Sequence, residues 1–160
     1  MDDHECATET NDQKKYDNTV KSRFFKCKCT CNMSNQDVLQ CVINAAETAL
    51  NELGPHQSES VYEQSIAFFL YQNNVTCMRQ VPVYESNLGR QIMVGIIDLE
   101  VGRSVVVELK SNLDKISDNN IQQIYRYKRA YAKNPVFDEE LTFAVILFAR
   151  SNELQIYIAK

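Results

Sequence analysis

The stretch from Gly95 to Lys110, GIIDLEVGRSVVVELK, constrains the fold of this 160-residue chain more than any other. Two apolar runs flank Gly102-Arg103-Ser104. Runs of β-branched and aliphatic residues that are bounded by a turn signal are typical of strands. If the three central residues form a hairpin loop, Val101 pairs with Val105. The sequence therefore predicts an antiparallel β-hairpin at the centre of the fold.

Three charged residues interrupt these apolar runs: Asp98, Glu108 and Lys110. Because side chains alternate along a strand, Glu108 and Lys110 share one face, and the hairpin register places Asp98 opposite Glu108. Two carboxylates so close repel each other unless a cation or a proton lies between them. Mg²⁺ prefers oxygen ligands, so the pair is a candidate metal site, with Lys110 beside it to hold a scissile phosphate or an attacking water. A cross-strand salt bridge on a water-facing sheet is the alternative.

The composition indicates one ordinary globular domain, with 44% hydrophobic and 24% charged residues. No apolar run approaches the roughly 20 residues of a membrane span, and the polar, acidic start of the chain is unlike a signal peptide. We therefore expect an intracellular protein, cytoplasmic or nuclear, without membrane contact. A net charge of −4 argues against strong nonspecific binding of nucleic acid, so such binding would depend on a local basic patch.

Residues 1–33 lack sustained periodicity and carry few aliphatic side chains. Such a segment cannot bury enough surface to offset its ordering entropy, so we expect a disordered tail before a domain that spans residues 34–160. Its segment KSRFFKCKCTC is a candidate nucleic-acid arm, targeting patch or protein contact, or only solvated tail. The spacing of Cys27, Cys29 and Cys31 lacks the second pair that zinc sites usually have, and zinc binding stays an open alternative.

The remaining chain predicts helices over 34–53, 58–73 and from Ser117 or Asp118 to Lys133. Strands are expected over 77–86, as an edge strand, and over 141–150 and 154–160. The first of the last two is apolar on both faces, which indicates a central, buried strand. In the second helix, Val61, Ile66, Phe69 and Leu70 are the expected core contacts. The order of elements predicts an α/β sandwich around a mixed sheet.

Both later helices carry further candidate site residues. Glu59 and Tyr62 lie near the start of the second helix, where an acidic residue also favours the helix dipole. The third helix is the most basic and aromatic part of the domain, and we expect Arg126, Lys128 and Arg129 to contact a nucleic-acid backbone. An ordinary amphipathic helix with solvated Lys and Arg is the alternative.

Five segments follow one another along the chain: LGPHQSESVYEQSI, RQVPVYES, GIIDL, VVVELK and QQIYRYKRA. Together they resemble the GxxExxY family, a branch of the PD-(D/E)XK nuclease-like superfamily, over about residues 36 to 150. The resemblance implies a three-layer, restriction-endonuclease-like core with a mixed four- to five-stranded sheet flanked by helices. His56 stands where the family has its first glycine, and Ile97 stands where the superfamily has a proline.

The resemblance also assigns the acidic and basic residues to roles. The superfamily's metal-binding Asp matches Asp98, and its Glu-x-Lys matches Glu108-Leu109-Lys110. The implied metal is Mg²⁺ or Mn²⁺, held by Asp98, Glu108, the Leu109 carbonyl and Glu59. Lys110 would orient the attacking water or stabilise the developing charge.

The remaining family positions imply supporting roles. The Glu and Tyr of the family name match Glu59 and Tyr62, and a Gln-x-x-x-Tyr pattern matches Gln123 and Tyr127. The implied function is metal-dependent hydrolysis of phosphodiester bonds in nucleic acid, with DNA favoured over RNA. Two alternatives stay open: a catalytically silent nucleic-acid- or protein-binding module on the same fold, and a structural or interaction protein that contacts a protein partner through its acidic body and its flexible tail.

Overall fold

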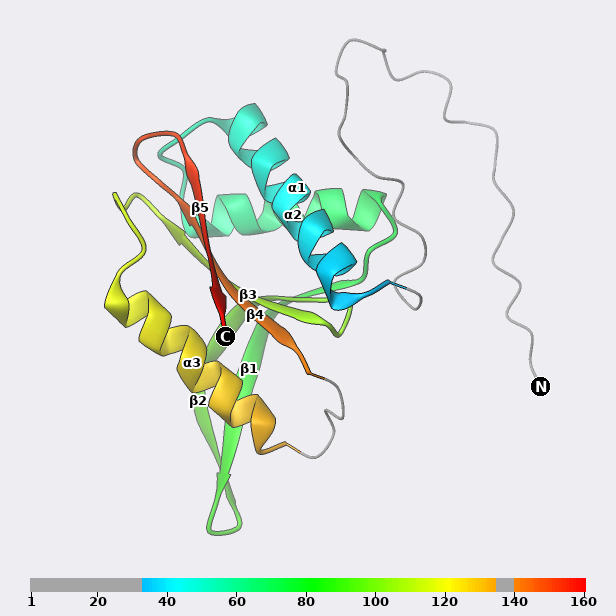
Figure 1. Cartoon of the computed structure of the whole chain (residues 1–160), viewed down its shortest axis with the longest axis vertical. Helices are drawn as coiled ribbons and strands as arrows, with labels where there is room; N and C mark the ends of the chain where they lie inside the picture. The colour runs from blue at the N-terminus through cyan, green and yellow to red at the C-terminus, as the bar shows by residue number, and fades with distance from the viewer. Residues whose placement is uncertain (1–32, 135–139) are drawn as a thin grey trace, which may run out of the picture.

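The computed structural model describes residues 33–134 and 140–160 of the chain. The predictions for residues 1–32, including those for the Cys27–Cys31 motif, lie outside this part. The elements follow in the expected order (Figure 1): α1 (Asn35–Leu53), α2 (Glu59–Gln72), β1 (Cys77–Asn87), β2 (Arg90–Val101), β3 (Val105–Ser111), α3 (Asp118–Ala132), β4 (Thr142–Phe148) and β5 (Leu154–Ala159).

The five strands form one mixed sheet in the order β1-β2-β3-β4-β5. Neighbouring strands are antiparallel except β3 and β4, which are parallel. A parallel pair needs a crossover connection, and α3 provides it. The sheet confirms that β4 is an interior strand and that β1, which contains Pro82, lies at an edge. Since α1 and α2 cover one face and α3 the other (Figure 1), the predicted three-layer α/β fold is confirmed.

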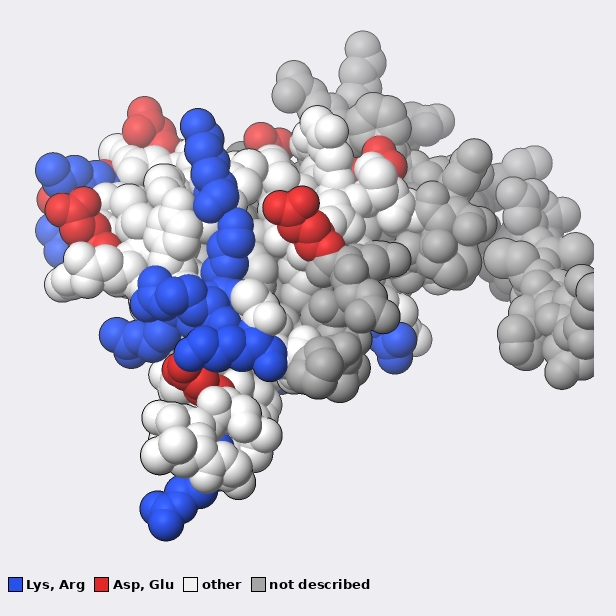
Figure 2. All heavy atoms as spheres, turned by 60° about the horizontal axis from the view of Figure 1, so that its bottom comes forward, with Lys and Arg blue, Asp and Glu red and all other residues white. Residues whose placement is uncertain are grey.

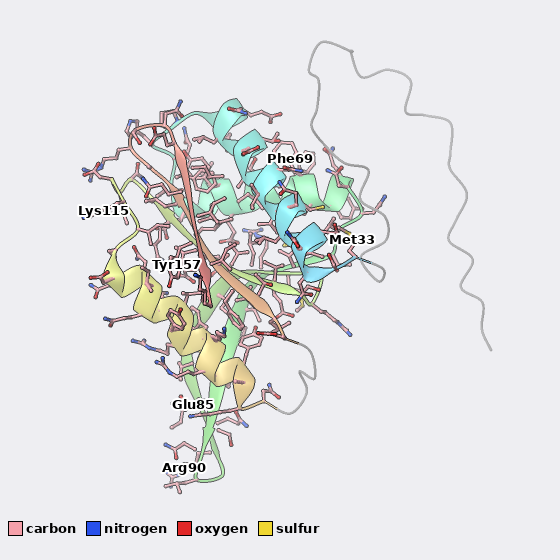
Figure 3. All side chains as sticks on the ribbon, in the orientation of Figure 1. Met33, Phe69, Glu85, Arg90, Lys115 and Tyr157 are labelled. Carbon is pink, nitrogen blue, oxygen red and sulfur yellow. The ribbon has the colours of Figure 1, made fainter. Side chains whose placement is uncertain are left out.

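Two hydrophobic cores fill the spaces between these layers (Figure 3). In the α1/α2-side core, Val105, Val107 and Leu109 of β3 pack against the first two helices. In the α3-side core, Val106 of β3 packs with residues of α3 such as Ile124. The alternation of β3 therefore holds as predicted and leaves Glu108 on the α3 side.

Hydrogen-bonding side chains fix where the helices begin. Ser34 and Asp37 form the predicted capping box at α1, and Ser117 forms another with Asn120 at α3. Ser58 accepts from the Val61 amide at the start of α2. These caps satisfy amides that have no partner within the helix, which explains why the predicted starts agree with the structure.

The expectation that Val61 contacts the core is wrong, because its side chain is exposed. Tyr62 and Ile66 face the core instead. Of the helices that the structure describes, none is long and apolar enough to cross a membrane.

Strands β1 and β2 form a hairpin arm that extends beyond α3 (Figure 1), with Arg90 near its tip (Figure 3). Leu88 and Gly89 at the tip both have positive φ, 48° and 75°. Such a pair is typical of a two-residue turn between antiparallel strands.

Candidate functional site

The β2–β3 hairpin places the charged residues at the point where its two strands separate. Val101 pairs with Val105 as predicted, but the ladder ends at Leu99 and Val107. Asp98 is therefore not paired with Glu108 across the sheet, and that expectation is corrected. Instead, Asp98 Oδ2 accepts a hydrogen bond of 2.7 Å from the Leu109 amide.

The cause is a break in side-chain alternation along β2. In a regular strand, residues two apart share a face. Ile97, however, belongs to the α3-side core, whereas Leu99 belongs to the α1/α2-side core. Asp98 lies between them and is half-buried. Its carboxylate accepts from the Leu109 amide, which in a regular ladder would donate to a backbone carbonyl.

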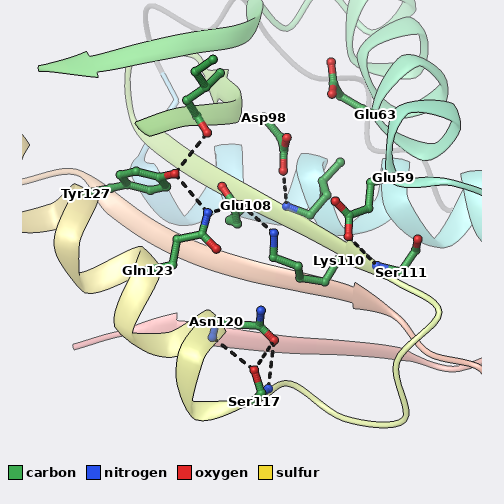
Figure 4. A network of polar contacts seen from close by, with 12 residues as sticks. Glu59, Glu63, Asp98, Glu108, Lys110, Ser111, Ser117, Asn120, Gln123 and Tyr127 are labelled. Carbon is green, nitrogen blue, oxygen red and sulfur yellow. Dashed lines mark hydrogen bonds and ion pairs between the residues drawn. The ribbon is translucent and has the colours of Figure 1, made fainter. Parts of the chain in front are cut away.

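Glu108 is the buried acid of the site (Figure 4). Its Oε1 accepts hydrogen bonds from Lys110 Nζ at 2.7 Å and from Gln123 Nε2 at 2.6 Å. Its Oε2 is buried and has no hydrogen-bond partner. A buried carboxylate oxygen without a partner costs free energy, so it indicates a missing positive ligand or a proton.

The pKa values reflect the same crowding of charge. Burial, and then the negative charge of Asp98, raise the pKa of Glu108 to about 7 in spite of the opposing contact with Lys110. Burial also raises the pKa of Asp98, although the Leu109 amide and the charge of Lys110 oppose it. For Lys110, burial alone would lower the pKa, but the hydrogen bond and charge of Glu108 raise it above its ordinary value. Lys110 is therefore charged at neutral pH, while Glu108 is partly protonated there.

Helix α3 brings its Gln-x-x-x-Tyr pair to the site. Gln123 Nε2 donates to Tyr127 Oη at 3.0 Å as well as to Glu108, and Tyr127 Oη donates to the Ile96 carbonyl at 3.2 Å. Gly95 makes this approach possible, because a Cβ there would lie 2.5 Å from Tyr127 Oη. Gln123 and Tyr127 thus join β2, β3 and α3 around Glu108.

Helix α2 brings Glu59 to the opposite side of the site (Figure 4). Glu59 Oε1 accepts a hydrogen bond of 3.2 Å from the Ser111 amide, one residue after Lys110. His56, in the preceding loop, has φ of 68°, the left-handed conformation that glycine adopts most easily. The loop therefore keeps a glycine-like backbone although histidine stands there, and Glu59 still reaches β3.

Tyr62 lies in the core and does not line the site. Its ring stacks on Phe148 with centroids 3.7 Å apart, and its hydroxyl donates to the Gly54 carbonyl at 2.6 Å. Tyr62 is fully buried, so direct contact with a nucleic acid is excluded. It supports Glu59 indirectly, because it fixes the loop from which α2 begins.

The basic residues of α3 lie on the outer side of that helix. Arg126 and Arg129 are exposed and Lys128 is partly exposed. Figure 2 shows basic side chains gathered over α3 next to the hairpin arm, where Lys133 forms an ion pair with Glu85. Within the described part of the chain, no ion pair joins these three cations to the carboxylates of the site, whereas Lys110 pairs with Glu108.

Four residues bonded to the site carboxylates, directly or through Gln80 and Glu63, were not predicted as site residues: Glu63, Arg79, Gln80 and Ser111. Glu63 is one helical turn after Glu59, and this spacing alone would have placed both on one face of α2. Gln80 has no comparable signal, because its contact with Asp98 depends on an irregularity in β1.

The donor set suits a hard divalent cation. Asp98, Glu108 and Glu59 offer carboxylate oxygens, and Glu108 Oε2 is available for a ligand. Over residues 33–134 and 140–160, no group of three or more His, Cys, Asp and Glu side chains is gathered as a preformed metal site. The Leu109 amide contacts Asp98, while a role for its carbonyl stays a prediction.

One of the comparisons with known proteins identifies a superfamily. A family model described as the PD-(D/E)XK nuclease superfamily matches residues 36–136. The search of curated proteins gave no match, and neither did the search of solved structures. The match spans α1 to α3 and includes Asp98, Glu108 and Lys110. On this match and this fold, the chain belongs to the PD-(D/E)XK nuclease superfamily.

Proposed function

We propose that this protein is a metal-dependent nuclease that hydrolyses phosphodiester bonds in nucleic acid, with DNA favoured over RNA. Within the superfamily we place it in the GxxExxY branch, because Glu59, Tyr62, Gln123 and Tyr127 match that pattern. The observation that carries the proposal is the buried Glu108 Oε2, which has no partner beside a second carboxylate and a lysine. Other charged side chains that are buried in the described part have partners.

In this proposal Asp98, Glu108, the Leu109 carbonyl and Glu59 hold Mg²⁺ or Mn²⁺. When bound there, such a metal would polarise the phosphate and lower the pKa of a water molecule. Hydrogen bonds from the Leu109 amide to Asp98 and from Gln123 to Glu108 help to orient the two carboxylates. Such fixed orientation is what a site needs to favour the transition state over the bound substrate.

Lys110 supplies the positive charge of the site. Its Nζ is 2.7 Å from Glu108 Oε1 and its side chain is largely buried, so the charge is little screened by water. We assign Lys110 to orient the attacking water or to stabilise charge on the phosphate. Arg126, Lys128 and Arg129 would contact the substrate backbone at phosphates other than the one that reacts.

A set of thermal-unfolding and cleavage measurements tests the proposal. Mg²⁺ or Mn²⁺ should raise the melting temperature of the wild type, because a ligand of the folded state alone stabilises it. Asp98→Asn and Glu108→Gln should lose this shift. Lys110→Ala should keep most of it and lose cleavage of a panel of labelled DNA and RNA, whereas Lys115→Ala, an exposed lysine in the next loop, should keep both.

The same measurements would contradict the proposal in a defined way. A wild type without a metal-dependent shift and without cleavage of any nucleic acid would favour the catalytically silent binding module. A modest loss of stability in Asp98→Asn and Lys110→Ala, with no effect of metal on any variant, would favour a simple salt bridge.

A further inference from the structure

We infer that Glu63, Arg79 and Gln80 form a positioning network that fixes the orientation of Asp98. The inference deepens the proposed function and rests on it, since Asp98 is the proposed metal ligand. None of the three residues is itself assigned to the metal or to the substrate.

The network begins at the amide of Gln80. Its Nε2 donates to Glu63 Oε2 at 2.6 Å and to Asp98 Oδ1 at 3.3 Å. With the Leu109 amide on Oδ2, both oxygens of Asp98 accept hydrogen bonds. A carboxylate held at both oxygens cannot rotate freely about its last bond, so the remaining lone pairs point in fixed directions.

Glu63 anchors the Gln80 amide. Only 3% of Glu63 is exposed, and its Oε1 accepts a charge-assisted hydrogen bond of 2.7 Å from Arg79 Nε. Both Glu63 oxygens are thus occupied by Arg79 and Gln80. Figure 4 shows Glu63 on α2, on the α2 side of Asp98. Its partners and place suit an anchor rather than a ligand.

The backbone of β1 is distorted where it presents Gln80. Arg79 pairs with Leu99 and Val81 with Ile97, but Gln80 and Asp98 between them do not pair. Gln80 has φ of 53°, which is unfavourable for a side chain of this type. Strained residues persist when the surrounding structure holds them and are frequent at functional sites. Here the side chains of Gln80 and Asp98 contact each other in place of a backbone pair.

Without the Gln80 amide, Asp98 would depend on the Leu109 amide alone. The carboxylate could then turn about that single contact, and the Leu109 N–H would report the change. In metal sites, loss of a hydrogen bond to a ligand typically weakens metal affinity by roughly 10- to 100-fold.

Two substitutions remove the network by different routes. Gln80→Gly removes the amide but suits the positive φ of that position, so the backbone should be kept. Glu63→Gln leaves one acceptor oxygen for two donors, so either Arg79 or Gln80 loses its partner. Gln91→Gly, at an exposed glutamine of the same hairpin, is the matched control.

The first measurement uses the metal-free protein. In ¹H–¹⁵N spectra, the Leu109 amide resonance should move in Gln80→Gly and in Glu63→Gln, and stay in place in Gln91→Gly. Because both changes act through one amide, the double variant should shift little beyond Gln80→Gly. An unmoved Leu109 resonance in Gln80→Gly would overturn the inference, whether or not the protein binds metal.

The second measurement is calorimetric titration with Mn²⁺ at a temperature where all variants are folded. Gln80→Gly and Glu63→Gln should bind Mn²⁺ at least about tenfold more weakly than the wild type and the control. Lower melting temperatures with unchanged Mn²⁺ affinity would show a merely structural role and overturn the inference. A wild type that does not bind Mn²⁺ contradicts the proposed function, while the Leu109 resonance still decides whether the network positions Asp98.

Discussion

The α1/α2-side core and the α3-side core differ in the side chains that the sheet contributes to them. To the α1/α2-side core, the sheet contributes apolar residues such as Leu99, Val107 and Leu109. Toward α3, it presents two buried glutamates, each bound to α3: Glu100 accepts from Tyr131 at 2.8 Å and Glu108 from Gln123. The apolar core on one side of the sheet thus contributes mainly stability, while the sheet directs its two buried glutamates to the other side.

This difference has an energetic meaning. Apolar burial stabilises the fold wherever it occurs, whereas a buried carboxylate stabilises it only when its oxygens are satisfied. Glu108 has one satisfied oxygen and one without a partner. We therefore expect changes to the apolar residues of the α1/α2-side core to alter stability alone, and changes at Glu108 to alter stability and metal response together.

The largest loss of stability should come from the α1/α2-side core. Leu70→Ala removes a side chain that is 1% exposed in α2. Such a cavity should lower the free energy of unfolding by about 2–5 kcal/mol. Urea unfolding with and without Mg²⁺ measures this loss. The increment in unfolding free energy that Mg²⁺ causes should be the same in Leu70→Ala and in the wild type. A lost increment would mean that the two cores are not separate in function.

On the α3 side, Glu108→Gln should stabilise the metal-free protein at alkaline pH. The pKa of Glu108 is raised from 4.5 to about 7 in the fold, so the folded state favours its protonated form. The stability contributed by that form is complete below pH 4.5 and is lost as the pH rises through about 7. The shift corresponds to at most about 3 kcal/mol.

Urea unfolding at pH 5 and pH 8 without metal checks this difference. The wild type should lose more stability than Glu108→Gln between these values, and only the wild type should gain stability from Mg²⁺ at pH 8. If both proteins respond equally to pH, the buried oxygen of Glu108 is not the source of the dependence.

A smaller effect is expected where α3 approaches β2. Gly95→Ala would place a Cβ 2.5 Å from Tyr127 Oη and 2.6 Å from a ring carbon of Tyr127. Relief of this overlap should cost about 1–3 kcal/mol and displace Tyr127 from Gln123. Thermal unfolding gives the loss, and Ile96→Ala, at an exposed neighbour, is the control. A Gly95→Ala protein as stable as the wild type would show that Tyr127 has room to move.

The smallest effect should be a gain in stability at the loop before α2. His56→Gly should raise the free energy of unfolding by less than about 1 kcal/mol, because the φ of His56 suits glycine, although glycine loses more entropy on folding. Thermal unfolding measures it, with Ser60→Gly inside α2 as a control that should destabilise instead. A loss of stability in His56→Gly would indicate a side-chain role for His56.

The sequence predicted those features that depend on local chemistry. Ser34, Ser58 and Ser117 marked the helix starts, and the apolar pattern of β4 identified an interior strand. It could not predict the position of Asp98, because ideal alternation put this residue opposite Glu108. The break between Ile97 and Leu99 results from packing against two different helix layers. Tyr62 was likewise grouped with the site by its motif, whereas stacking on Phe148 places it in the core.

The distorted edge strand has a consequence for self-association. An exposed edge offers unpaired backbone groups to strands of other molecules, and this is a common start of aggregation. Strand β1 is interrupted by the left-handed Gln80, by Pro82 and by a register shift between Val83 and Tyr84. A second chain would therefore find few consecutive groups with which to pair. Met78 and Tyr84 on this strand are exposed, so its edge is apolar. The same irregularity that brings Gln80 to Asp98 therefore also protects this edge from pairing with another molecule.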